Sequence, residues 1–144
     1  GQLFILHCLW LKVFNMGAEK TKAKILMIED DTFYLKIYED QLIRHGFEFI
    51  AATNGVEGMH KLMAEKPDLV LLDLMLPQQN GFEWLEEVKK NEKTKDVEVV
   101  VLTNLGQQSD IDTAMALGAA DYIVKTNVRM SDVIDKINRR LSEK

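Results

Sequence analysis

Cysteine and histidine are scarce in this sequence of 144 residues. It has a single cysteine, Cys8, and three scattered histidines: His7, His45 and His60. One cysteine cannot form a disulfide within the chain, which is typical of a reducing compartment, and we therefore expect a cytoplasmic protein. So few sulfur and imidazole groups exclude a zinc site with the usual four ligands. We interpret His45 and His60 as solvated helix residues.

A net positive charge and a membrane-spanning run are also lacking. The formal net charge is −5, and phosphate backbones select basic surfaces, so we expect no nucleic-acid partner for this chain by itself. The apolar stretch 3–14 is shorter than the roughly 20 residues that cross a bilayer. It also lacks the leading positive charges and the cleavage site of a signal peptide. We therefore expect no membrane insertion.

The first sixteen residues differ from the rest of the chain. Residues 1–16 are rich in apolar side chains, and the sequence turns polar at Gly17. We interpret 1–16 as an apolar extension, either a tag or an upstream translated segment, and Met16 as the natural start. A short docking helix and a membrane-surface anchor stay open as alternatives. Residues 17–144, in a chain that is 47% hydrophobic and 28% charged, then form one globular domain.

From residue 22 onward, short apolar runs alternate with helical patterns. The runs predict strands at 23–28, 48–52, 69–72, 97–102 and 122–124. Apolar residues recur at helical spacing after each strand: Phe33, Ile37, Tyr38 and Leu42; Met59, Leu62 and Met63, directed inward; Phe82, Leu85 and Val88; Ile111, Ala114, Met115 and Leu117; and Val133, Ile134, Ile137 and Leu141. Gly46 and Gly118 are typical helix stops. Five β–α units in succession predict an α/β fold, a doubly wound parallel sheet with helices on both faces.

Polar side chains follow four of the five predicted strands. They are Glu29, Asp30 and Asp31 after the first strand, Asp73 after the third, Thr103 after the fourth and Lys125 after the fifth. Open parallel sheets bind ligands beyond the carboxyl ends of their strands, so we expect these groups to share one cleft. Gathered carboxylates repel one another unless a cation neutralises them, and oxygen ligands suit Mg²⁺. Helix capping is the competing explanation for Asp31, but it does not require Thr103 or Lys125.

Four segments of the sequence, KILMIEDD, LVLLDLMLPQQNGF, VVVLTN and GAADYIVK, resemble the receiver domains of two-component response regulators. The resemblance covers residues 22–144 and implies the flavodoxin-like strand order 2-1-3-4-5. It implies a signalling switch rather than a turnover enzyme. A sensor histidine kinase, a phosphotransfer protein or a small phosphodonor would phosphorylate Asp73. The surface of the fourth helix, fifth strand and fifth helix would then control an output protein or a fused output domain, or form a homodimer.

The resemblance also assigns roles to individual residues. It implies a site for Mg²⁺, or Mn²⁺, formed by Glu29 through water, Asp30, Asp73 and the backbone carbonyl of Met75. Thr103 and Lys125 would each contact a phosphoryl oxygen. Tyr122 occupies the place of an aromatic residue that turns inward when Thr103 moves toward the phosphate.

Several positions depart from the family pattern. Thr126 replaces the proline that usually follows the lysine, and because a non-proline cis peptide bond costs about 2.5–4 kcal/mol, we expect a trans bond there. Asn104 replaces a small residue, and we expect it to narrow access to Asp73. Met75 and Leu105 occupy positions that tune the lifetime of the phosphate. Neither side chain can orient an attacking water, which predicts a long-lived phosphoryl group.

Other functions fit the sequence less well than a switch. A degenerate receiver that binds partners without phosphorylation is left open by Asn104 and Thr126. A phosphatase of the haloacid-dehalogenase type needs a second acid two residues after its nucleophile, where this chain has Met75. A flavodoxin would require a phosphate-binding loop where Glu29, Asp30 and Asp31 stand. The absence of a GxxxxGK[ST] motif excludes a P-loop NTPase.

Overall fold

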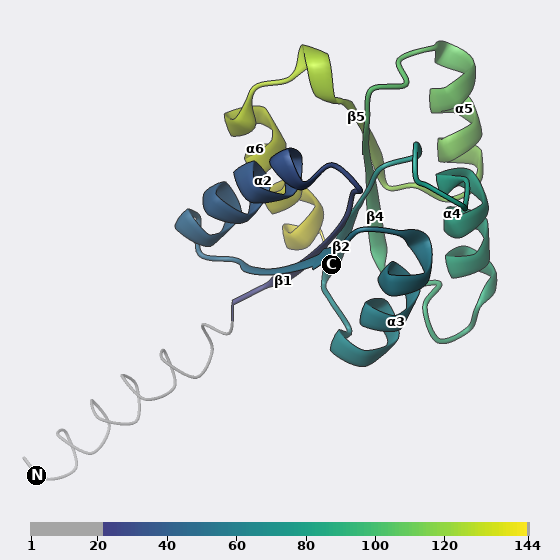
Figure 1. Cartoon of the computed structure of the whole chain (residues 1–144), viewed down its shortest axis with the longest axis horizontal. Helices are drawn as coiled ribbons and strands as arrows, with labels where there is room; N and C mark the ends of the chain where they lie inside the picture. Colours follow the sequence, from purple (N-terminus) through teal and green to yellow (C-terminus); the bar gives the residue numbers. More distant parts are fainter. Residues whose placement is uncertain (1–21, 144) are drawn as a thin grey trace, which may run out of the picture.

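The computed structural model describes residues 22–143, in which a central sheet separates two layers of helices (Figure 1). The elements, in chain order, are β1 (Lys24–Ile28), α2 (Thr32–Arg44), β2 (Glu48–Ala52), α3 (Gly55–Glu65), β3 (Leu69–Leu72), α4 (Gly81–Lys90), β4 (Glu98–Thr103), α5 (Gln108–Ala116), β5 (Asp121–Val124), the 3₁₀ turn η1 (Lys125–Asn127) and α6 (Met130–Ser142). Each predicted strand lies within one residue of its observed bounds. The interpretation of residues 1–16 lies outside the described residues. Within 22–143, no helix is long and apolar enough to span a bilayer.

The strands are all parallel, in the order β2-β1-β3-β4-β5, which confirms the doubly wound α/β fold. Ile28 of β1 pairs with Leu72 of β3, and Leu72 pairs with Val101 of β4. The next residues along β1 and β3, Glu29 and Asp73, therefore leave the sheet side by side. The register of the sheet thus aligns the residues that follow its central strands.

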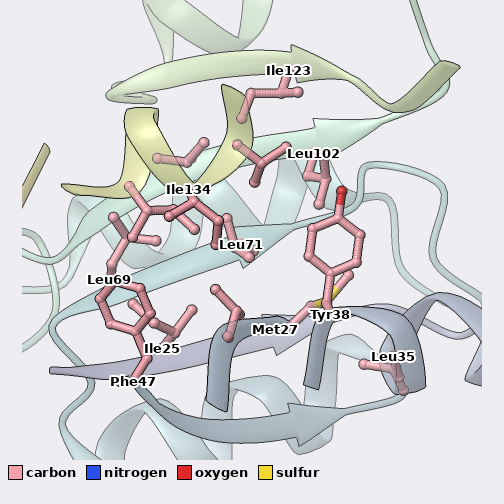
Figure 2. Close-up of a cluster of buried hydrophobic side chains, with 14 residues drawn as sticks. Ile25, Met27, Leu35, Tyr38, Phe47, Leu69, Leu71, Leu102, Ile123 and Ile134 are labelled. Atoms are coloured by element: carbon pink, nitrogen blue, oxygen red, sulfur yellow. The ribbon is translucent and has the colours of Figure 1, made fainter. Parts of the chain in front are cut away.

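Both faces of the sheet are apolar, as the uninterrupted hydrophobic strands require. On one face, strand residues such as Ile25 and Leu71 pack beneath α2 and α6, and Figure 2 shows them with Tyr38 of α2 and Ile134 of α6. On the other face, α3, α4 and α5 cover a second cluster around Trp84, which is fully buried. These two cores fix the strands, and with them the positions of the residues at the strand ends.

The predicted inward position of Met63 is wrong, because this residue is 40% exposed. Met115 and Phe33, which also belong to the helical apolar patterns, are 44% and 68% exposed. The buried face of α3 consists of Gly55, Gly58 and Leu62, and Met63 follows Leu62 by about 100° around the helix. Each helix meets the sheet with one face only, so apolar residues at the margin of that face remain in contact with solvent.

Candidate functional site at the carboxyl ends of the strands

Asp73 is the centre of the site. It follows β3 directly and is only 6% exposed. Its Oδ1 accepts hydrogen bonds from the Thr103 hydroxyl at 2.8 Å and from the Met75 N–H at 3.0 Å. Its Oδ2 lies 3.0 Å from the Lys125 Nζ. The ends of β3, β4 and β5 thus bring a carboxylate, a hydroxyl and an ammonium group together, as the sequence predicts.

Glu29 is the second buried acid of the site. Its side chain is 1% exposed, and its Oε1 accepts a hydrogen bond from the Lys125 Nζ. Its other oxygen, Oε2, has no hydrogen-bond partner among the described residues. A buried carboxylate oxygen without a partner is costly unless a proton or a cation satisfies it. This oxygen therefore marks a place for a positively charged ligand.

Three carboxylates form an acidic cluster at this end of the sheet. Glu29, Asp30 and Asp73 each place one oxygen within 4.8 Å of the others. Asp30 is exposed, so the cluster opens to solvent and an ion could enter from that side. Carboxylate oxygens are the ligands that Mg²⁺ prefers. The donor set and the orphaned Oε2 of Glu29 therefore fit a hard divalent cation.

The electrostatics of the two buried acids differ. Burial, reinforced by the neighbouring Asp73, raises the pKa of Glu29 to about 8 despite the contact with Lys125. Burial also acts to raise the pKa of Asp73. The protonated Glu29 beside Asp73, the hydrogen bond from the Met75 N–H and the charge of Lys125 outweigh burial and hold the Asp73 pKa below its usual value. Asp73 is thus a charged carboxylate at neutral pH, whereas Glu29 holds a proton there when no cation is bound.

Lys125 remains protonated in this setting. Burial acts to lower its pKa, but its hydrogen bonds to Glu29 and Asp73 outweigh burial and raise that pKa. The peptide bond between Lys125 and Thr126 is trans, because residues 22–143 contain no cis peptide bond. This confirms the trans bond expected from the sequence. The chain continues from Lys125 directly into η1.

The backbone around Asp73 depends on a close approach of α4. The Gly81 N–H donates to the Leu74 carbonyl at 3.0 Å. A Cβ at position 81 would lie 2.5 Å from the Leu74 Cα and 2.7 Å from the Asp73 carbonyl oxygen. Glycine at this position therefore lets the start of α4 support the backbone that carries Asp73.

The remaining predicted site residues lie around the central group, on the loops after β1, β3 and β4 and on β5. The Tyr122 hydroxyl donates to the Leu105 carbonyl at 2.6 Å. Burial raises the pKa of Tyr122 to about 12, so this phenol stays neutral. Asn104 is exposed, and the side chain of Met75 is 56% exposed. Asp31 caps α2 by accepting a hydrogen bond from the Phe33 N–H at 2.9 Å, which confirms the capping explanation for this acid.

Two contributors to the site were not predicted from the sequence. One is Gly81, to which no role in the site was assigned. The other is Tyr34, whose ring centroid lies 4.3 Å from the Lys125 Nζ. The available signal was its spacing: Tyr34 precedes Tyr38 by four residues and so shares its helix face. The exposed histidines, His45 and His60, lie outside the site, as expected.

Comparison with known proteins agrees with this geometry. Residues 25–138 match the family described as response regulator receiver domain. The chain is 32% identical over 120 residues to the chemotaxis protein CheY of Bacillus subtilis, a match that covers 83% of this chain and 98% of CheY. It is 37% identical over 106 residues to the probable transcriptional regulator ycf27 of Guillardia theta, covering 74% of this chain and 41% of ycf27. The chain spans about two fifths of the length of the ycf27 relatives.

Solved structures show the same fold. The CheY-like receiver domain protein from Methanospirillum hungatei JF-1 superimposes with a TM-score of 0.79 at 29% identity, covering 85% of this chain and 96% of that one. The BeF₃-activated N-terminal receiver domain of Klebsiella pneumoniae RstA gives a TM-score of 0.77 at 27% identity, covering 82% and 97%. Since the family match extends over most of the chain, this chain belongs to the receiver domains of two-component response regulators.

Proposed function

We propose that Asp73 accepts a phosphoryl group from a sensor histidine kinase, a phosphotransfer protein or a small phosphodonor, and that this event switches the domain. The observation that carries the proposal is the setting of Asp73. It is a buried carboxylate with a lowered pKa, held between the Thr103 hydroxyl and the Lys125 ammonium group. Membership of the receiver family supports phosphorylation-dependent signalling as the general role.

The chemical step follows from these groups. A carboxylate oxygen of Asp73 attacks the phosphorus of the donor and forms a new P–O bond. The bond between phosphorus and the donor's leaving atom breaks, and its electron pair stays on that atom, the imidazole nitrogen of a phosphohistidine or the acetate oxygen of acetyl phosphate. Lys125 and Thr103 contact the phosphoryl oxygens, where charge must be balanced during transfer.

The acidic cluster supplies the cation site for this step. Asp30 and Asp73 would bind Mg²⁺, or Mn²⁺, directly, Glu29 would bind it through water, and the Met75 carbonyl would complete the set. When bound, the ion neutralises negative charge on the phosphoryl group. The spacing of the three carboxylates and the unpartnered Glu29 Oε2 support this assignment.

Phosphorylation would act on the rest of the domain through Thr103. Its hydroxyl would leave Asp73 Oδ1 for a phosphoryl oxygen, and the loop that begins at Asn104 would move with it. Tyr122 contacts this loop at the Leu105 carbonyl, so its side chain would respond and alter the surface of α5, β5 and α6. An output protein, a fused output domain or a second copy of the chain would bind that surface. The relative RpaA of Synechocystis is named as a DNA-binding regulator.

Intact-mass measurement tests the proposal. The protein is incubated with acetyl phosphate and Mg²⁺, and wild type is compared with Asp73→Ala and with Asp96→Ala, an exposed aspartate before β4 at the opposite end of the sheet. We expect a gain of about 80 Da in wild type and Asp96→Ala, and none in Asp73→Ala or without Mg²⁺. A gain that persists in Asp73→Ala would overturn the assignment. No gain with either acetyl phosphate or a kinase would favour a degenerate receiver that only binds partners.

A further inference from the structure

Lys125 is enclosed by groups from three other elements. Its side chain is 3% exposed. Glu29 after β1 and Asp73 after β3 accept its hydrogen bonds, and the ring of Tyr34 on α2 lies 4.3 Å from its Nζ. The distance is well within the range of about 6 Å for an attraction between a cation and an aromatic ring. Because the ammonium group is shielded from water, this attraction is stronger than at a protein surface.

The two residues that follow Lys125 are in contact with solvent. Thr126 and Asn127 continue into η1 and are exposed. Lysine also has a flexible four-carbon side chain that its own backbone does not fix in one direction. The direction of the Lys125 side chain therefore depends on what other elements place around it.

Tyr34 is well fixed to serve this purpose. It lies in the first turn of α2, which Asp31 caps. It packs against the core cluster that contains Tyr38, one turn later, and Tyr38 is only 5% exposed. The neighbouring Phe33 is 68% exposed and meets Tyr34 edge-on, with the ring centroids 6.3 Å apart. The Tyr34 ring is thus held between the core and the ammonium group.

We propose that Tyr34 is a positioning residue for Lys125, holding its ammonium group over the phosphoacceptor through the cation–ring contact; this inference rests on the proposed function of the site. Unlike the ion pair with Asp73, the contact between Lys125 and the Tyr34 ring is unaffected by the chemical change at Asp73. When Asp73 becomes an acyl phosphate, the contact of Lys125 with the carboxylate is replaced by a contact with a phosphoryl oxygen, so the anionic partner of Lys125 changes during the reaction. The ring of Tyr34 does not change during the reaction, so it keeps Lys125 in place before and after transfer.

Three variants separate this role from simple packing. Tyr34→Phe keeps the aromatic face and removes the hydroxyl, whereas Tyr34→Leu removes the aromatic face and stays apolar. Phe33→Leu is the matched control, because Phe33 is the adjacent aromatic residue and no cation–ring contact of its own is seen among residues 22–143. We expect Tyr34→Leu to slow phosphorylation by acetyl phosphate about three- to tenfold, and Tyr34→Phe and Phe33→Leu to stay within about twofold of wild type. Mg²⁺ affinity should be unchanged in all three.

Two further measurements test whether Tyr34 acts through Lys125. In NMR spectra, the ring current of Tyr34 should shift the Lys125 Cε protons upfield in wild type and Tyr34→Phe, and this shift should vanish in Tyr34→Leu. In a Lys125→Gln background, adding Tyr34→Leu should slow phosphorylation no further. If Tyr34→Leu does not fold, as judged by Mg²⁺ binding and thermal unfolding, Tyr34→Met replaces it, since methionine also fills the space without an aromatic face.

The outcomes distinguish this inference from the function on which it rests. A wild-type protein that no donor phosphorylates would overturn the proposed function, and the positioning role with it. A wild-type protein that is phosphorylated, with Tyr34→Leu as fast as Tyr34→Phe, would overturn the positioning role alone. An equal additional loss from Tyr34→Leu in the Lys125→Gln background would also overturn it, because Tyr34 would then act independently of Lys125.

Discussion

At the scale of single residues, the two oxygens of Asp73 have different neighbours. Oδ1 accepts hydrogen bonds from Thr103 and from the Met75 N–H, while Oδ2 faces Lys125. Glu29 completes the arrangement, because it shares Lys125 with Asp73 and has one oxygen without a partner. The proposed nucleophile and the proposed cation site are therefore parts of one hydrogen-bonded group.

The exposed side chain of Met75 provides a test at this scale. It is 56% exposed beside Asp73 and cannot orient a water molecule for attack on an acyl phosphate. We expect Met75→Asn to raise the rate of autodephosphorylation by a few-fold, measured as loss of the phosphorylated mass after the donor is removed. Met115→Asn is the control, because Met115 is 44% exposed on α5. An unchanged rate in Met75→Asn would contradict the proposed tuning role.

The sequence predicted which residues converge, but not how they contact one another. The carboxyl ends of parallel strands meet at one edge, so Asp73, Thr103 and Lys125 could be grouped from strand positions alone. The burial of Glu29 and its contact with Lys125 depend on how the side chains that follow β1 and β5 meet above the strands that lie between them, which no local pattern encodes. Tyr34 was missed for the same reason, since its partner lies on a distant element.

At the scale of the elements, α4 positions Asp73 through backbone contact. We expect Gly81→Ala to lower the free energy of unfolding by about 1–3 kcal/mol, because the added Cβ collides with backbone that cannot move independently. Urea unfolding measures this loss, and the amide resonances of Asp73 and Leu74 should shift. In Gly106→Ala, the added Cβ would meet no atom closer than 3.6 Å, and an equal loss in that variant would contradict the explanation.

The end of α3 carries a strained residue. Lys66 has a φ of 48°, in the left-handed region, and its N–H donates to the Leu62 carbonyl. We expect Lys66→Gly to raise the free energy of unfolding by about 0.5–1 kcal/mol in urea unfolding, since glycine adopts this conformation without strain. Glu65→Gly, one residue earlier within the helix, should instead lower it by about 1 kcal/mol. A loss of stability in Lys66→Gly would show that the backbone strain is smaller than supposed.

The two predicted glycine stops illustrate how far local rules extend. Gly46 and Gly118 follow the helices they were expected to end, with φ values of 88° and 105°. Lys66 adopts the same left-handed backbone conformation without being glycine, so its residue type did not predict this conformation. Met63 was misassigned because helical periodicity identifies an apolar face but does not locate the centre of that face against the sheet.

At the scale of the whole molecule, we expect the acidic cluster to couple stability to pH and to divalent cations. The pKa of Glu29 rises from 4.5 to about 8 on folding. A raised carboxyl pKa stabilises the folded state fully below pH 4.5, and this contribution is lost as the pH rises to about 8. Over this range, Glu29 lowers the free energy of unfolding by at most about 1.4 kcal/mol per pH unit. A bound cation would replace the proton.

This coupling predicts a pH-dependent effect of Mg²⁺. We expect saturating Mg²⁺ to raise the melting temperature more at pH 8 than at pH 6, because at pH 6 it must displace the proton of Glu29. Thermal unfolding with and without Mg²⁺ measures this difference. Glu29→Gln, which cannot titrate, should make the Mg²⁺ effect nearly independent of pH. An equal pH dependence in wild type and Glu29→Gln would assign the coupling to other groups.

The central claim is that Asp73 itself carries the phosphoryl group. The most direct measurement is to phosphorylate the protein with acetyl phosphate and Mg²⁺, reduce the acyl phosphate with borohydride, and sequence the peptides by tandem mass spectrometry. Borohydride converts a phosphorylated aspartate to homoserine and leaves free carboxylates unchanged. We predict homoserine at position 73 alone. Homoserine at another aspartate, with none at position 73, would contradict the account.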